Sequence, residues 1–122
     1  MRVSAVLVAG LLVGSGAAFA QGQQSDYQTR VYRLSELLGM LHAVRPVCEP
    51  AEELHWYDRM NEMIRLERPT SDQKVGMINR FNAGYASGQR FTVCTDAARA
   101  FAASTAREGE AISRALAAAV GN

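Results

Sequence analysis

The sequence predicts an all-α fold, a small antiparallel four-helix bundle stapled by one disulfide and preceded by a cleavable signal peptide. Apolar residues recur at steps of three and four in four segments, which is the period of amphipathic helices. Four such helices with short links fold as an antiparallel bundle, whose first and third links emerge at the same end. The only two cysteines, Cys48 and Cys94, fall in those links. Periodicity and cysteine placement therefore indicate the same topology.

The N-terminus has the pattern of a secretory signal peptide. Arg2 precedes an apolar run over residues 3–13, and Ala18 and Ala20 form the A-x-A pattern that a signal peptidase reads. The run is about half of the roughly 20 residues that a membrane-spanning helix needs, so we expect cleavage after Ala20. The chain then divides into a signal peptide (1–20), a mobile N-terminal lead (21–25) and a single helical domain (26–122) without a membrane span, located in the periplasm.

The predicted mature chain is electrically neutral. Removal of Arg2 with the leader leaves twelve basic and twelve acidic side chains of the original 13 and 12. A neutral balance gives no electrostatic reason to expect nucleic acid or anionic lipid as a partner. Another envelope protein is the partner that we expect.

The first helix has the clearest periodic signal. Ser25 is placed to cap it, and Pro46 should stop it near Val44, because the residue before a proline is disfavoured in helical conformation. Its apolar stripe consists of Tyr27, Val31, Leu34, Leu38 and Leu41.

The second helix is expected to begin at Pro50, which the first turn tolerates, with Glu52 and Glu53 at the positive end of the helix dipole. Pro69 marks its end. Its predicted apolar face is Leu54, Tyr57, Met60 and Ile64, with Trp56 and Met63 at the margin.

The third helix should open at Ser71, because Thr70 and Gln73 match the T-x-x-Q capping box, and Gly88 is a natural stop. Its predicted inward residues are Val75, Ile78, Phe81 and Tyr85.

The fourth helix follows Thr95 as its cap, and Gly109 lowers its helix propensity enough to predict a kink or break near residues 108–110. Small side chains in the first half of its stripe would allow close packing. The stripe is Ala98, Ala102, Thr105, Gly109, Ile112, Leu116 and Ala119.

Cys48 and Cys94 are expected to form a disulfide, because export leads to an oxidising compartment. The alternatives are a metal pair and a reactive thiol. A structural metal site needs four closely spaced ligands, which are absent, and a reactive thiol needs a base, for which His42 and His55 flank Cys48 in sequence. A bridge closing a loop of about 47 residues would stabilise the fold by roughly 4 kcal/mol.

No residue pattern predicts a cofactor or a catalytic centre. Glu52 and His55 form one E-x-x-H motif, but di-iron bundles need two, so a dipole-matched helix start is the simpler interpretation. His55, Met60 and Met63 offer ligands that suit monovalent copper, and His42 or His55 with a methionine could ligate haem. Methionines at helical spacing are more often core residues. Nucleophile-elbow, S-x-x-K and H-E-x-x-H motifs are absent.

Aromatic and arginine side chains form a candidate interaction surface. Trp56 and Tyr57 are neighbours on one helix, about 100° apart, so one of them should lie at a rim. Exposed aromatics beside arginine are typical of contact surfaces, although a boundary aromatic that covers the bundle edge is the competing interpretation. The candidate residues are Trp56, Tyr57, Arg59, Arg80 and Tyr85.

Two blocks resemble a known family. The strings YRLSELLG (32–39) and RPVC (45–48), with RFNAGY (80–85) and FTVCT (91–95), look like the two cysteine-containing blocks of a family of small exported bacterial proteins of unknown function. Trp56 lies between the blocks. The resemblance implies export and a common fold, and it carries over no catalytic residue or cofactor.

Together these observations predict a non-enzymatic binding or interaction module of the cell envelope. The alternative is a small metal or haem carrier that uses His55, Met60 and Met63. Metal content and the absorption spectrum of the purified protein distinguish the two.

Overall fold

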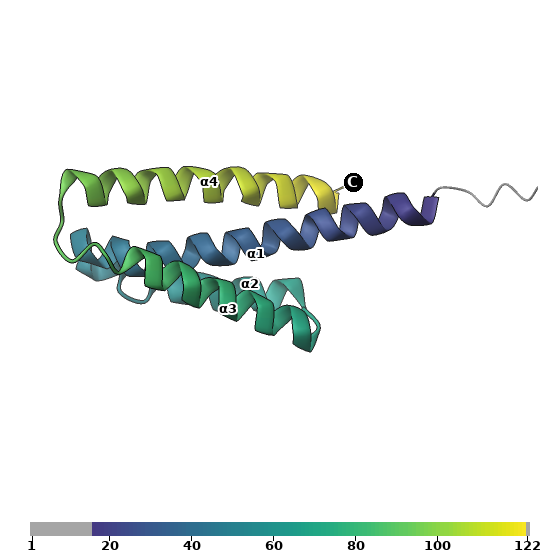
Figure 1. Ribbon diagram of the computed structural model, residues 1–122, viewed down its shortest axis with the longest axis horizontal. Coiled ribbons are helices and arrows are strands. Elements are labelled where there is room, and N and C mark those ends of the chain that lie inside the picture. Colours follow the sequence, from purple (N-terminus) through teal and green to yellow (C-terminus); the bar gives the residue numbers. More distant parts are fainter. Residues whose placement is uncertain (1–15, 122) are drawn as a thin grey trace, which may run out of the picture.

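The computed structural model describes residues 16–121, and its secondary structure is helical (Figure 1). No strand occurs among these residues. The predicted four-helix, all-α fold is confirmed. In chain order the elements are α1 (Gly16–Cys48), the short 3-10 helix η1 (Pro50–Glu52), α2 (His55–Glu67), α3 (Ser71–Gly88) and α4 (Asp96–Gly121).

The helix α1 is the centre of the bundle. The other three helices each pack against it, whereas α2 and α3 touch each other little, and α4 makes at most marginal contact with either. In Figure 1, α4 runs along one side of α1, and α2 and α3 lie on the other side, with α2 behind α3. A square bundle would give each helix two neighbours. Here α1 supplies apolar side chains to three partners.

The core follows from this central position. Leu37 and Val44 are each 1 % exposed although they lie outside the stripe that the sequence predicted. They add a second apolar face to α1, which a helix with several partners requires. The main core cluster consists of Val31, Leu38, Met60, Met77, Phe81 and Leu116. A smaller cluster near the disulfide consists of Val44, Ala98 and Ala102.

Both predicted ends of α1 were wrong. The helix begins at Gly16, before the expected Ser25 cap, and continues through Pro46 to Cys48. A proline in the last turns removes one hydrogen bond, and the ladder resumes where the Glu49 amide donates to the Arg45 carbonyl at 2.8 Å. Residues 1–15 of the predicted signal peptide lie outside the described residues, and the division into leader, lead and domain stays a prediction.

The helix α2 begins later than predicted and presents a different face. Pro50 opens the separate turn η1, and α2 starts at His55. Leu54 and Tyr57, predicted to face inward, are 62 % and 48 % exposed. Trp56 and Met63, predicted at the margin, pack instead against the core beside Met60 and Ile64. The prediction that one of Trp56 and Tyr57 lies at a rim is confirmed, and Pro69 follows the end of the helix as expected.

The predicted start of α3 is confirmed, but its predicted inward face was mostly wrong. Both bonds of the capping box form: the Gln73 amide donates to Thr70 Oγ1 at 3.2 Å and the Thr70 amide to Gln73 Oε1 at 3.0 Å. The helix ends at Gly88 as expected. Val75, Ile78 and Tyr85 are exposed, and the buried residues are Met77, Phe81, Gly84 and Gly88.

Glycines set the packing of α3 on α1. A Cβ atom at Gly84 would lie 1.9 Å from the Glu36 carbonyl oxygen, and one at Gly39 would lie 2.0 Å from the Phe81 carbonyl oxygen. The two backbones therefore touch where the two helices meet. Only glycine permits so close an approach. The face of α3 that carries Gly84 therefore packs against α1.

The helix α4 is unbroken, so the break predicted near residues 108–110 was wrong. The Ala98 amide donates to Thr95 Oγ1 at 3.1 Å, which confirms the cap. Ile112 is half-buried and Ala119 is exposed, while the other members of the predicted stripe are buried: Ala98, Ala102, Thr105, Gly109 and Leu116.

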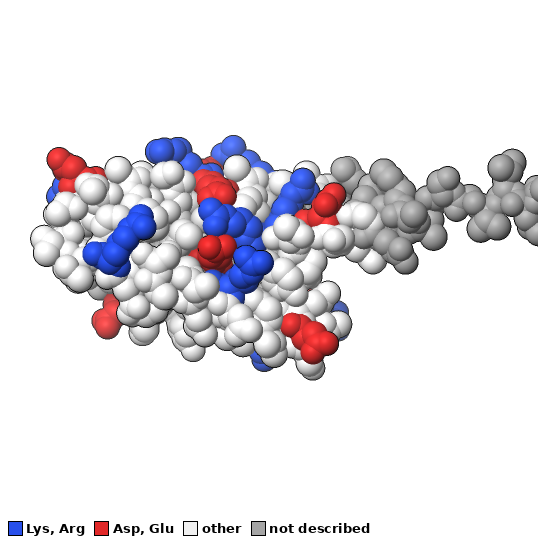
Figure 2. Space-filling view, viewed as in Figure 1, with Lys and Arg blue, Asp and Glu red and all other residues white. Residues whose placement is uncertain are grey.

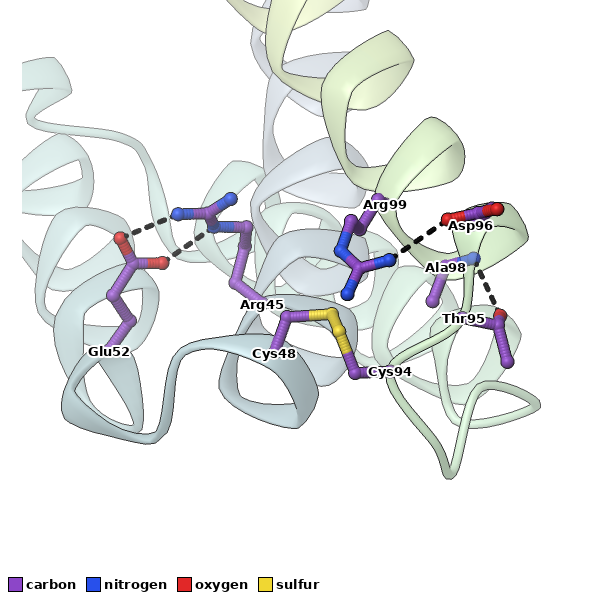
Figure 3. The surroundings of a disulfide bond; sticks show 8 residues. All are labelled: Arg45, Cys48, Glu52, Cys94, Thr95, Asp96, Ala98 and Arg99. Atoms are coloured by element: carbon purple, nitrogen blue, oxygen red, sulfur yellow. Dashed lines mark hydrogen bonds and ion pairs between the residues drawn. A yellow bond between two sulfur atoms is a disulfide. The ribbon is translucent and has the colours of Figure 1, made fainter.

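The predicted disulfide is present (Figure 3). It joins Cys48, the last residue of α1, to Cys94 in the link before α4, with the Cα atoms 4.9 Å apart. The two links predicted to meet at one end of the bundle therefore do so. Within residues 16–121, no helix combines the length and the apolar character needed to cross a bilayer.

An ion-pair network joins α4, α1 and α3. Figure 2 shows acidic and basic side chains interleaved across the face that these helices form. Arg33 on α1 donates to both carboxylate oxygens of Glu108 on α4, at 2.9 and 2.8 Å, and lies 3.1 Å from Glu36. Arg80 on α3 lies 3.7 Å from the same Glu36 carboxylate. Because these side chains are partly exposed, each pair adds at most about 1 kcal/mol.

Candidate functional site

An apolar groove runs between α2 and α4, with α1 as its floor. The part of it beside Trp56 has a volume of about 490 Å³. The floor is lined by Leu34, Leu37, Leu38 and Leu41. The α2 wall consists of His55, Trp56, Arg59, Glu62, Met63, Leu66 and Glu67, and the α4 wall of Ala106, Gly109, Glu110 and Ser113.

A second hollow, of about 400 Å³, continues the groove toward the start of α1. It shares five residues with the first: Leu34, Met63, Leu66, Glu67 and Ser113. It adds Tyr27, Leu116, Ala117 and Val120. We call the two hollows together the α2–α4 groove. From Leu41 to Tyr27 it follows about 14 residues of α1, which is about 21 Å at 1.5 Å per residue.

The groove exists because its walls differ in side-chain size. Its α4 wall consists mainly of small residues such as Ala106, Gly109 and Ser113, which cannot reach across to α2. Its α2 wall carries large apolar side chains, and Leu66 is 61 % exposed there. Leu34 on the floor is half-buried. Apolar surface is thus left uncovered along the groove.

Trp56 is held in place at the disulfide end of the groove. Its Nε1 donates to Glu52 Oε2 at 3.4 Å. Arg45 donates to the two oxygens of the same carboxylate at 2.7 and 3.0 Å (Figure 3). The hydrogen bonds from Arg45 lower the pKa of Glu52. The imidazole of His55 stands edge-on to the indole, with ring centroids 4.7 Å apart. These contacts orient the indole on the wall.

The rim of the groove is acidic. Arg59 lies 3.5 Å from Glu62, and Glu110 pairs with Arg114 further along α4. The hydroxyl of Tyr27 lies 2.9 Å from both oxygens of Glu67 and donates its one hydrogen bond to this carboxylate. Burial, and then the hydrogen bond to Glu67, raise the pKa of Tyr27 to about 12. Tyr27 is therefore uncharged at neutral pH, and its hydroxyl does not neutralise the Glu67 carboxylate.

The five residues of the predicted interaction surface lie in three places. Trp56 and Arg59 line the groove. Tyr57 and Tyr85 lie beside His42, at ring-centroid distances of 5.9 and 5.2 Å, on the separate surface between α2 and α3. Arg80 belongs to the ion-pair network. The structure therefore brings together two pairs from this set.

His42 is packed among aromatic rings, with Phe81 at 5.6 Å completing the set. Its Nδ1 is buried, with no hydrogen-bond partner among the described residues. Burial lowers the pKa of His42, and the charge of Glu53 opposes that shift. The imidazole is therefore neutral at neutral pH.

The alternative metal ligands are not gathered in one place. His55 and Met63 line the groove, whereas Met60 is 3 % exposed in the core and lines a different hollow, between α2 and α3. Glu52 of the E-x-x-H motif is engaged by Arg45. Across the described part of the chain, no three His, Cys, Asp or Glu side chains are placed to share a metal ion.

The groove has no signature in the sequence that marks it as a site. Its missed residues include Leu66, Glu67 and Ser113, which show no motif. The one sequence feature that could have indicated the groove is Leu37. It extends the apolar surface of α1 beyond a single stripe, which indicates that α1 packs against more than one partner.

A family model described as "Protein of unknown function (DUF2385)" matches residues 26–120. No curated protein and no solved structure matches the chain.

Proposed function

The chain belongs to the DUF2385 family, and from that premise we propose that it is a non-enzymatic binding module of the cell envelope. It is exported to the periplasm by its leader and docks another exported protein through the α2–α4 groove. The observation that carries this proposal is the continuous apolar floor, with Leu34 and Leu66 accessible along it.

The size and lining of the groove support binding. Ligand-binding clefts have volumes of about 300–1,000 Å³, are mostly apolar and carry a few polar groups that orient the occupant. The hollow beside Trp56, at about 490 Å³, falls in this range. Exposed apolar surface rimmed by polar residues is typical of interaction sites. The rim carboxylates of Glu62 and Glu110 are already paired with arginines, so they suit orientation of a partner better than proton transfer.

The predicted leader and the disulfide support the location. Intramolecular disulfides persist in oxidising compartments such as the bacterial periplasm. Here the bridge joins α1 to the start of α4, and these two helices form the floor and one wall of the groove. The bridge thus also favours a preformed site.

Site-specific photo-crosslinking in intact cells tests the proposal. A photoreactive residue replaces Leu66 in the groove or, as the matched control, Val75, which is 56 % exposed on α3. We expect a discrete protein adduct from position 66 and none from position 75. A second change, Ser113→Trp, fills the groove and should abolish the adduct. Equal adducts from both positions, or an adduct that survives Ser113→Trp, would exclude the groove as the docking surface.

A further inference from the structure

We infer that the α2–α4 groove receives an amphipathic helix whose apolar stripe is flanked by lysine or arginine. This inference rests on the proposed function, because it specifies the partner chemistry of the same groove. The shape of the groove, the side chains along it and the charge of its rim support it.

The shape fits a helix. Three helices pack on α1, and the sector between α2 and α4 stays open along about 21 Å. A helix of about 14 residues has that length. Packed helices lie 8–10 Å apart, and small side chains permit the closer approach. The α4 wall, with Ala106, Gly109 and Ser113, provides such side chains along its length.

The apolar side chains are spaced along the groove. Trp56 lies at the disulfide end, Met63 and Leu66 at the middle, and Val120 at the far end, where it is 73 % exposed. Trp56 and Met63 are two helical turns apart, as are residues i and i+7 of an amphipathic helix. Helices that dock in grooves anchor through such i, i+3, i+4 and i+7 positions.

The charge of the rim favours basic residues on both sides of the apolar stripe of that helix. The groove is lined by three carboxylates, from Glu62, Glu67 and Glu110, and by one arginine, Arg59. Among the described residues, Glu67 has the hydroxyl of Tyr27 as its partner and no cation within 4 Å. A lysine or arginine beside the apolar stripe would meet Glu67 directly and would share Glu62 and Glu110 with the arginines that already pair with them. A fatty acid or another anionic amphiphile would bring its headgroup against like charge, which disfavours a lipid occupant.

Synthetic peptides and the intrinsic fluorescence of Trp56 test the inference. Trp56 is the only tryptophan of the chain and lies on the groove wall. The first probe is a peptide of about 14 residues with a leucine stripe flanked by lysine. The second carries glutamate in place of lysine. The third has the composition of the first in a scrambled order that forms no stripe.

We expect a saturable fluorescence change with the lysine peptide, affinity at least about tenfold weaker for the glutamate peptide, and no saturation with the scrambled one. Equal binding of the lysine and glutamate peptides, or no saturable binding of the lysine peptide, overturns the inference. Palmitate and dodecylamine, below their micelle-forming concentrations, are the lipid arm of the test. If either binds more tightly than the lysine peptide, the groove is a lipid site and the helix is excluded.

Charge variants locate the effect on the rim. Changing Glu62, Glu67 and Glu110 together to glutamine should weaken the lysine peptide about tenfold and remove its advantage over the glutamate peptide. Glu53→Gln, exposed and outside the groove, is the matched control and should change neither. Retention of the tenfold preference in the triple variant contradicts the rim assignment. The salt dependence of binding to the unaltered protein gives the same test without a substitution.

The two proposals fail differently. If the crosslink at position 66 forms in cells but the lysine peptide does not bind, the groove docks a partner of other chemistry, and this inference alone is wrong. If the crosslink is also absent, the proposed function itself is wrong.

Discussion

Replacing Gly84 with alanine tests how closely α1 and α3 approach each other. A Cβ atom at this position would lie 1.9 Å from the Glu36 carbonyl oxygen. Carbon and carbonyl oxygen atoms of adjacent helices do not approach closer than about 3.3 Å, so the helices would have to separate by about 1.4 Å. The obstacle is backbone and cannot rotate away as a flexible side chain would.

The expected loss of stability is about 2–4 kcal/mol. Overpacking alone costs about 1–3 kcal/mol, and the separation also loosens the contacts of Met77 and Phe81, both buried on the same face of α3. In an unconstrained helix the same change would instead add about 1 kcal/mol, because alanine has the higher helix propensity. The sign of the effect therefore separates close packing from propensity.

Urea unfolding followed by far-UV circular dichroism, with the disulfide intact, measures the effect. Gly109→Ala is the matched control, because a Cβ atom there would lie 3.7 Å from Leu34 Cδ1, an ordinary contact. This control should gain up to about 1 kcal/mol. A Gly84→Ala protein as stable as the unaltered one, or two variants that change in the same direction, would refute the packing that we describe.

Four further predictions concern other parts of the fold. Replacing Cys48 and Cys94 with serine should lower the free energy of unfolding by about 4 kcal/mol, measured by urea unfolding beside the oxidised protein. Tyr27→Phe should lower the free energy of unfolding by about 1 kcal/mol, and the component near pH 12 should disappear from the tyrosine absorbance titration. In the unaltered protein, the stability that Tyr27 contributes should be lost as pH rises from about 10 through 12. Because burial lowers the pKa of His42, stability should fall as pH drops below about 6.5, and His42→Leu should flatten that part of the pH profile. Ser113→Leu should raise the midpoint of thermal unfolding by burying apolar surface in the groove, and it should abolish binding of the lysine-flanked peptide.

The number of helices and the boundaries from the end of α2 to the start of α4 were predictable because their signals are local. The capping box of Thr70 and Gln73, the Thr95 cap and the stop at Pro69 each depend on residues within one turn. Pro46 shows the limit of such signals. Its local preference is to end a helix, but α1 continues to Cys48, where the bridge to Cys94 holds the chain.

The faces of α2 and α3 were harder to predict because they depend on the partner helix. An apolar residue on α3 such as Ile78 remains 39 % exposed, since Gly84 determines which side meets α1. Periodicity ranks residues by hydrophobicity and passes over glycine, although a missing side chain sets the closest approach. The candidate site was missed for a similar reason. Trp56 and Arg59 belong to it, but a groove between two helices produces no recognisable pattern in the sequence of either helix.

Stability of the fold alone does not explain why the groove is open. Thr105 and Gly109 are buried and allow α4 to pack closely on α1, so small side chains have a structural reason there. Ala106 and Ser113 lie on the adjacent, exposed side of α4, where a leucine would fit a helix equally well and would cover apolar surface at Leu66. Natural proteins commonly forgo such stabilising changes where function needs an open site. The small residues on this side of α4 therefore keep the groove open, as the proposed docking of a partner requires.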